Sequence, residues 1–98
     1  MEGNMAVTVV AKVVVKKEFI EPVKAELLKL VDPTRRERGC MEYRLHQDNE
    51  DPGVFIFYEN WESMASLEQH MNSDHFRNYV SAVEGRLVKK VVNKMTGI

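Results

Sequence analysis

The sequence contains little cysteine, no long apolar run and no excess of one charge, and each shortage excludes a class of protein. The single cysteine, Cys40, cannot form a disulfide within the chain, so we expect a reducing, cytoplasmic setting. The longest apolar run, residues 54–57, is far shorter than the roughly 20 residues of a membrane-spanning helix. The 14 basic and 15 acidic residues give a formal charge of −1, without the clustered basic excess that nucleic-acid binding requires. We therefore expect neither a membrane nor a nucleic acid as partner.

Motifs for metal ions and phosphates are also missing. His70 and His75 are five residues apart, so one continuous helix would place them on different faces, and neither belongs to an H-E-x-x-H motif. The glycines are scattered and form no phosphate-binding or dinucleotide-binding loop. Cys40 has no histidine near it in the sequence and is a poor candidate for a catalytic nucleophile. The sequence thus predicts no metal site and no cofactor.

What the chain does contain is typical of one small globular domain. Its 98 residues, 44% of them hydrophobic and 30% charged, fit a single folded unit, which we place at residues 5–98. Residues 1–4 precede the first strand pattern and are interpreted as a frayed terminus or an expression remnant.

The spacing of apolar residues predicts six elements in the order strand, helix, strand, strand, helix, strand. The expected strands are residues 7–16, 40–47, 54–61 and 87–95, and the expected helical regions are residues 19–31 and 64–83. Asp32 and Pro33 should interrupt the first helix, and Gly39 should close any further turn. Ser63 is the expected N-cap of the second helical region, which breaks near Ser73. This order predicts an α+β fold of the ferredoxin-like βαββαβ kind with an antiparallel sheet.

The two faces of the predicted first strand differ in character. Val7, Val9, Ala11, Val13 and Val15 form one wholly apolar face, whereas the other face mixes valine with lysine. Helices in this fold cover only one face of the sheet. We therefore expect the second face to pack against the same face of a twin subunit in a homodimer.

The third predicted strand carries the candidate site. By strand parity Glu59 and the only tryptophan, Trp61, share a face, and Tyr43 on the neighbouring strand points the same way. Trp61 is either a core aromatic or the wall of a cavity that holds a flat apolar ligand. His70 lies at the edge of an apolar helical face, where it is either a packing residue or a group for proton transfer.

Three segments in this order resemble the antibiotic biosynthesis monooxygenase domain, and within it the quinol monooxygenase subgroup. They are RERGCMEYRLHQD at residues 36–48, FYENWES at 57–63 and LEQHMNSDHF at 67–76, and the resemblance extends over residues 7–98. It implies a dimeric α+β barrel with a pocket between sheet and helices in each subunit. It also implies oxidation of an aromatic quinol or polyketide by molecular oxygen, without metal or flavin.

The resemblance also assigns residues to the site. It gives Trp61 and His70 catalytic roles, and it gives Glu59 a hydrogen-bonding role through the E-x-W pattern. The expected substrate-binding residues are Tyr43, Phe57, Glu59, Met71 and Phe76.

Two other branches of this superfamily fit less well. The haem-degrading branch uses an asparagine and an axial histidine, and Ala11 and Val80 stand near those positions here. A branch that isomerises a phosphorylated sugar derivative would need a cationic pocket, whereas the inward faces here are mostly apolar.

Three interpretations remain open at this point. The first is a cofactor-independent monooxygenase that oxidises a small quinol or phenol with molecular oxygen. The second is a non-catalytic dimeric domain that binds a small hydrophobic ligand. In the third, Trp61, Phe57 and Met71 fill the interior and leave no ligand site.

Overall fold

The computed structural model describes residues 5–98, so the interpretation of residues 1–4 concerns residues outside the described part. The elements in chain order are β1 (Val7–Val15), the 3-10 helix η2 (Lys17–Phe19), α1 (Ile20–Arg35), β2 (Cys40–Gln47), β3 (Val54–Trp61), α2 (Met64–Met71), α3 (Asp74–Val83) and β4 (Leu87–Met95). The predicted ferredoxin-like order is confirmed, with the second helical region divided into α2 and α3.

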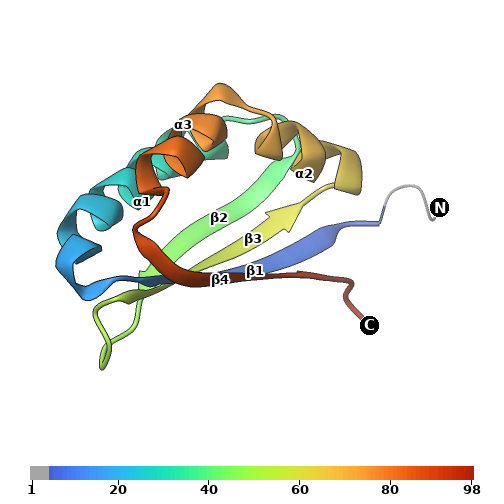
Figure 1. Cartoon of the computed structure of the whole chain (residues 1–98). Helices are drawn as coiled ribbons and strands as arrows, with labels where there is room; N and C mark the ends of the chain where they lie inside the picture. Colours follow the sequence, from blue (N-terminus) through green and yellow to red (C-terminus); the bar gives the residue numbers. More distant parts are fainter. Residues whose placement is uncertain (1–4) are drawn as a thin grey trace.

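The four strands form one antiparallel sheet in the order β2-β3-β1-β4. The helices lie on one face of this sheet, and no helix of residues 5–98 covers the other face (Figure 1). The chain is therefore built in two layers, with the core between them. In the same residues, no helix combines the length and apolar character needed to cross a membrane.

The core forms where the helix-facing side of the sheet meets α1. Val23, Leu27 and Leu30 recur at intervals of four and three, which brings them to one face of α1, and at most 2% of each is exposed. They pack in one cluster with inward residues of the central strands, such as Val9 and Phe55. Burial of each large aliphatic or aromatic side chain contributes about 1.5–3 kcal/mol, so the contact between α1 and the sheet contributes strongly to stability.

The first helix does not end at Asp32 and Pro33, as the sequence suggested. It continues to Arg35 with Pro33 inside its last turn. A proline removes its own N–H bond and crowds the preceding turn. Here Leu30 and Thr34, which are one turn apart and both buried, hold this end of the helix against the rest of the protein. Tertiary packing thus outweighs the local preference of the proline.

The turn after α1 packs closely against α2. Gly39 has a φ of +87°, which confirms the predicted left-handed conformation. A Cβ atom at this position would overlap the side chain of Ser66 on α2. Glycine therefore lets the turn that carries Glu37 approach α2 closely.

Serine side chains begin both helices of the second helical region. Ser63 is the predicted N-cap of the first, whereas for the second the sequence predicted only a break near Ser73. The Ser63 hydroxyl accepts the N–H of Ser66 at 3.1 Å, and the Ser73 hydroxyl accepts the N–H of Phe76 at 3.3 Å. The chain therefore leaves one helix at Met71 and starts another at Asp74. This break changes the direction of the chain between His70 and His75.

Candidate active site

The buried pair of Glu59 and Trp61 lies near the end of β3. The indole N–H of Trp61 donates a hydrogen bond of 2.8 Å to Oε1 of Glu59, and the two side chains are 0% and 5% exposed. Strand parity places both side chains on the helix-facing side of the sheet. There the carboxyl of Glu59 accepts the hydrogen bond that the buried indole N–H would otherwise need from water. The tryptophan therefore provides the partner that a buried carboxylate requires.

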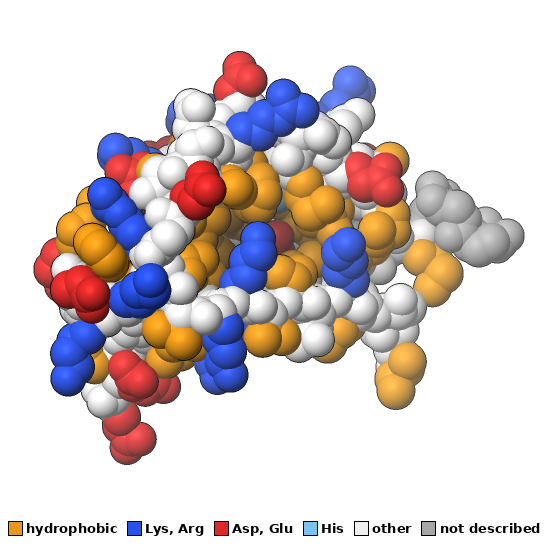
Figure 2. Space-filling view, in the orientation of Figure 1, with side chains coloured by type: hydrophobic (Ala, Val, Ile, Leu, Met, Phe, Trp, Pro, Cys, Tyr) orange, Lys and Arg blue, Asp and Glu red, His pale blue; other side chains and the backbone are white. Residues whose placement is uncertain are grey.

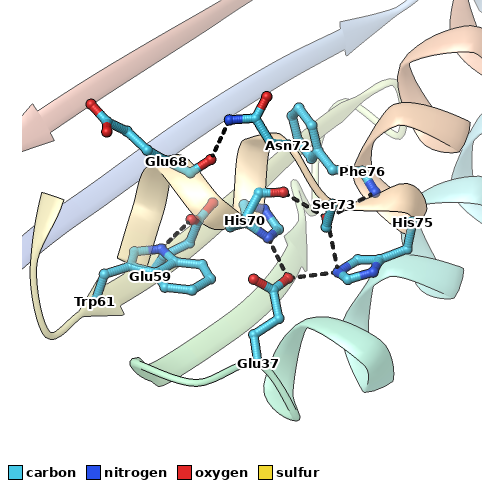
Figure 3. Close-up of polar contacts among 9 residues, drawn as sticks. All are labelled: Glu37, Glu59, Trp61, Glu68, His70, Asn72, Ser73, His75 and Phe76. Atoms are coloured by element: carbon cyan, nitrogen blue, oxygen red, sulfur yellow. Dashed lines mark hydrogen bonds and ion pairs between the residues drawn. The ribbon is translucent and has the colours of Figure 1, made fainter. Parts of the chain in front are cut away.

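His70 forms a second buried pair, with Glu37. Its Nδ1 lies 2.7 Å from Oε2 of Glu37 (Figure 3). The ring is almost fully buried, and the rings of Trp61, Tyr43 and Phe76 surround it. A carboxylate can only accept, so Nδ1 carries the proton in the neutral imidazole. Nε2 is then left as a hydrogen-bond and proton acceptor.

A cavity of about 80 Å³ lies between the sheet and helices α2 and α3. The hollow is flanked by hydrophobic side chains, with an acidic side chain visible inside it (Figure 2). Glu59 is the only acidic residue of the lining among the described residues. Six of the predicted site residues line this cavity, namely Tyr43, Phe57, Glu59, His70, Met71 and Phe76. Because a void is present, these side chains do not fill the interior completely.

Trp61 does not line the cavity. Its ring packs behind the lining residues, with its centroid 4.8 Å from that of His70 and 6.4 Å from that of Tyr43. The residue thus supports the site by holding Glu59 and the His70 ring, and no surface of the indole is exposed to a ligand.

Burial changes the protonation of the groups around the cavity. It raises the pKa of Glu59 from 4.5 to about 7, and only part of this rise is offset by the hydrogen bond from Trp61. Burial lowers the pKa of His70, while the hydrogen bond to Glu37 acts in the opposite direction. It also raises the pKa of Tyr43, so the phenol stays neutral. Near neutral pH the site therefore holds a neutral imidazole and a carboxyl group near its titration point, which suits proton transfer.

Sequence reasoning missed Glu37 and His75. One continuous helix would place His70 and His75 on different faces, but the predicted break near Ser73 puts them on two helices, and the sequence did not show that both then face Glu37. His75 Nε2 lies 2.6 Å from the same Oε2 of Glu37 that His70 contacts. Glu37 is part of the segment that carried the family resemblance, but no local pattern indicated its partners.

We expect replacement of Glu59 by glutamine to reduce the pH dependence of stability. Because the pKa of Glu59 rises from 4.5 to about 7 on folding, the folded state binds the proton more tightly, and stability falls as pH rises across this range. The full shift corresponds to a loss on the order of 3 kcal/mol above the folded pKa. In Glu59→Gln the amide oxygen still accepts the Trp61 N–H, but the side chain cannot ionise.

Urea unfolding of the wild type and Glu59→Gln at about pH 5 and about pH 8.5 measures this effect. The variant should gain free energy of unfolding relative to the wild type at the higher pH only. An equal difference at both pH values would show that Glu59 titrates normally.

Comparison with known proteins places this architecture in a family. The sequence profile described as antibiotic biosynthesis monooxygenase matches residues 6–82. The solved structure of PA3566 from Pseudomonas aeruginosa superposes with a TM-score of 0.93 at 31% identity, over 98% of this chain and 97% of that one.

Two curated relatives have names that include a monooxygenase activity. "Putative monooxygenase Rv0793" of Mycobacterium tuberculosis is 31% identical over 85 residues, which is 87% of this chain and 83% of that protein. "Probable quinol monooxygenase YgiN" of Escherichia coli is 29% identical over 72 residues, which is 65% of this chain and 69% of that protein. The matched part is 48% of the length of a further relative, sll1783 of Synechocystis. From the profile match and these similarities, the chain belongs to the antibiotic biosynthesis monooxygenase family.

Proposed function

We propose that this protein is a cofactor-independent monooxygenase that oxidises a small aromatic quinol or phenol with molecular oxygen. The observation that carries the proposal is a buried imidazole, held by Glu37, at the edge of a cavity with aromatic walls. Membership of the family supports the reaction type, and the name of YgiN supports a quinol as substrate class.

The proposed reaction begins with removal of a proton from a quinol hydroxyl. His70 Nε2 is the acceptor, and the carboxylate of Glu37 stabilises the imidazolium that forms. The electron-rich quinol anion then reacts with oxygen in a site from which water is largely excluded. One oxygen atom enters the hydroxyquinone product and the other leaves as water. All four electrons come from the quinol, so the balance needs no further reductant.

The size of the cavity bears on how a substrate enters. Its volume of about 80 Å³ is below the roughly 300–1,000 Å³ typical of ligand sites. Two lining residues, Met71 at 38% and Val92 on β4 at 49% exposure, are accessible from outside. Lys90, also in the lining, brings a positive charge that would attract a phenolate. We therefore propose that the substrate widens the cavity on the β4 side.

Oxygen uptake on mixing the protein with a reduced naphthoquinol in aerated buffer tests this function. We expect uptake above the uncatalysed background, saturable in quinol, with a hydroxylated quinone as product. A rate equal to the background would exclude the activity for this substrate class. If quinol still bound saturably under those conditions, the non-catalytic ligand-binding domain would be the better description.

We also propose a homodimer in which the uncovered sheet faces pack together. Tyr58 and Val91 project from this face and are 38% and 42% exposed, which leaves apolar surface uncovered on a single chain. Two-fold dimers are the commonest oligomers, and their interfaces pair the same surface patch of both subunits, which would bury this surface.

The unpaired thiol of Cys40 fits the reducing cytoplasm in which we place the protein.

A charge introduced in the middle of this face should separate the subunits. Ile56 lies opposite Lys12 on β1 and His46 on β2, so Ile56→Lys would add a cation beside existing basic groups. We expect light scattering to give twice the single-chain mass for the wild type and the single-chain mass for this variant. Leu28→Lys is the matched control, because Leu28 is 55% exposed on α1 and should not affect association. A wild-type protein with the mass of one chain would refute the dimer.

A further inference from the structure

Three potential metal ligands meet beside the cavity, and His70 is the one among them that also lines it. Glu37 comes from the turn after α1, His70 from the last turn of α2 and His75 from the first turn of α3 (Figure 3). Nδ1 of His70 and Nε2 of His75 lie 2.7 and 2.6 Å from Oε2 of Glu37, and all three atoms are within 4.8 Å of one another. The two histidines are close in the sequence, whereas Glu37 is 33 and 38 residues away from them.

We propose that Glu37, His70 and His75 bind a divalent transition-metal cation of the zinc class. Two imidazoles and one carboxylate are ligands that Zn²⁺ favours, whereas Mg²⁺ and Ca²⁺ prefer oxygen ligands. Ligand atoms about 2.0–2.2 Å from a tetrahedral ion lie roughly 3.3 Å apart. The three atoms here lie within 4.8 Å of one another. Small shifts of the side chains would therefore bring them to the distances of a tetrahedral site.

The site is open to solvent on one side, which a cation needs to enter. The side chains of Glu37 and His75 are 14% and 26% exposed, whereas that of His70 is 3% exposed. Water can therefore complete the coordination from the side of His75. Without a cation, the two imidazole N–H groups donate to the same oxygen of Glu37. A bound cation would replace both hydrogen bonds, because it uses the same nitrogen and oxygen atoms.

Metal binding would change the role of His70 in the cavity. A neutral imidazole that ligates a metal through Nδ1 carries its proton on Nε2. Nε2 would then donate instead of accept, and it could not take a proton from a quinol. The cation would thus inhibit the reaction and take no part in its chemistry. This inhibition rests on the proposed function, whereas the binding of the cation does not.

Titration of the tag-free full-length chain tests the site without any substrate. Calorimetry with zinc chloride should show one Zn²⁺ per chain, and cobalt chloride should produce the visible absorption of ligated Co²⁺. His75→Ala should weaken binding by at least about 10-fold, because it removes a ligand and leaves the buried His70–Glu37 pair intact. Circular dichroism would verify that this variant is folded.

Two variants serve as controls for the identity of the ligands. His46→Ala removes the third histidine, which lies on the opposite face of the sheet, and Cys40→Ser removes the only thiol. Light scattering would verify that His46→Ala keeps the mass of the wild type, because His46 lies on the proposed dimer face. Both should bind Zn²⁺ like the wild type. Absence of stoichiometric binding, binding that persists in His75→Ala, or loss of binding in either control would overturn the proposal. If the wild type oxidises quinol, Zn²⁺ should inhibit it at concentrations at least about 10-fold lower than those that inhibit His75→Ala.

Discussion

Replacement of His70 by alanine is expected to lower the rate of quinol oxidation by about 10²- to 10⁴-fold, the usual contribution of a general base. His70 is the residue that combines a free acceptor nitrogen, a place in the cavity lining and an orienting carboxylate. Alanine removes the acceptor nitrogen Nε2, so the substrate hydroxyl would have to lose its proton in a largely apolar cavity without this base. Initial rates of oxygen uptake at saturating quinol measure the loss in kcat.

Glu37→Gln separates the orientation of the imidazole from its charge. The amide oxygen can still accept the Nδ1–H of His70, but it cannot stabilise an imidazolium as a carboxylate does. We expect this variant to lose part of kcat while KM changes little. His46→Ala, on the sheet face opposite the cavity, is the control for removal of a histidine and should retain both the wild-type rate and the wild-type mass in light scattering. Full activity in His70→Ala would remove this residue from the mechanism.

Replacement of Trp61 by alanine is expected to destabilise the protein by about 3–5 kcal/mol, as for other large aromatic side chains truncated in a core. The indole is fully buried, and it contacts both His70 and Tyr43. Its removal also leaves the buried carboxyl of Glu59 without its donor. The midpoint and slope of urea unfolding give the change in free energy, which is a large part of the stability of a small domain.

Trp61→Phe distinguishes the packing of the indole from its hydrogen bond. Phenylalanine retains most of the apolar contact but has no N–H, so the expected loss is that of an unpaired buried acceptor, about 1–3 kcal/mol. The same change should raise the pKa of Glu59 further, because the Trp61 hydrogen bond holds it down. The free energy of unfolding that Trp61→Phe loses should therefore be larger at alkaline than at acidic pH. A Trp61→Phe variant as stable as the wild type at alkaline pH would show that the hydrogen bond contributes nothing.

Much of the candidate site could be predicted from the sequence because strand parity is a local property. Phe57 and Glu59 are two residues apart on β3, so they share a face, and Tyr43 joins them through the short β2–β3 hairpin. These residues do line the same cavity. The prediction for Trp61 was less complete. Parity places its ring on the inward side but does not distinguish a lining residue from one packed behind it.

The sequence by itself determined the order of the elements, the inward and outward faces of the strands, the serine cap of α2 and the break before α3. Each of these depends on side chains within a few residues of one another. Only the tertiary structure decided that α1 continues through Pro33 and that Glu37 meets both His70 and His75, which are 33 and 38 residues away. Contacts of this kind depend on how whole helices pack and where one ends, and the residues that make them have no periodic pattern of their own.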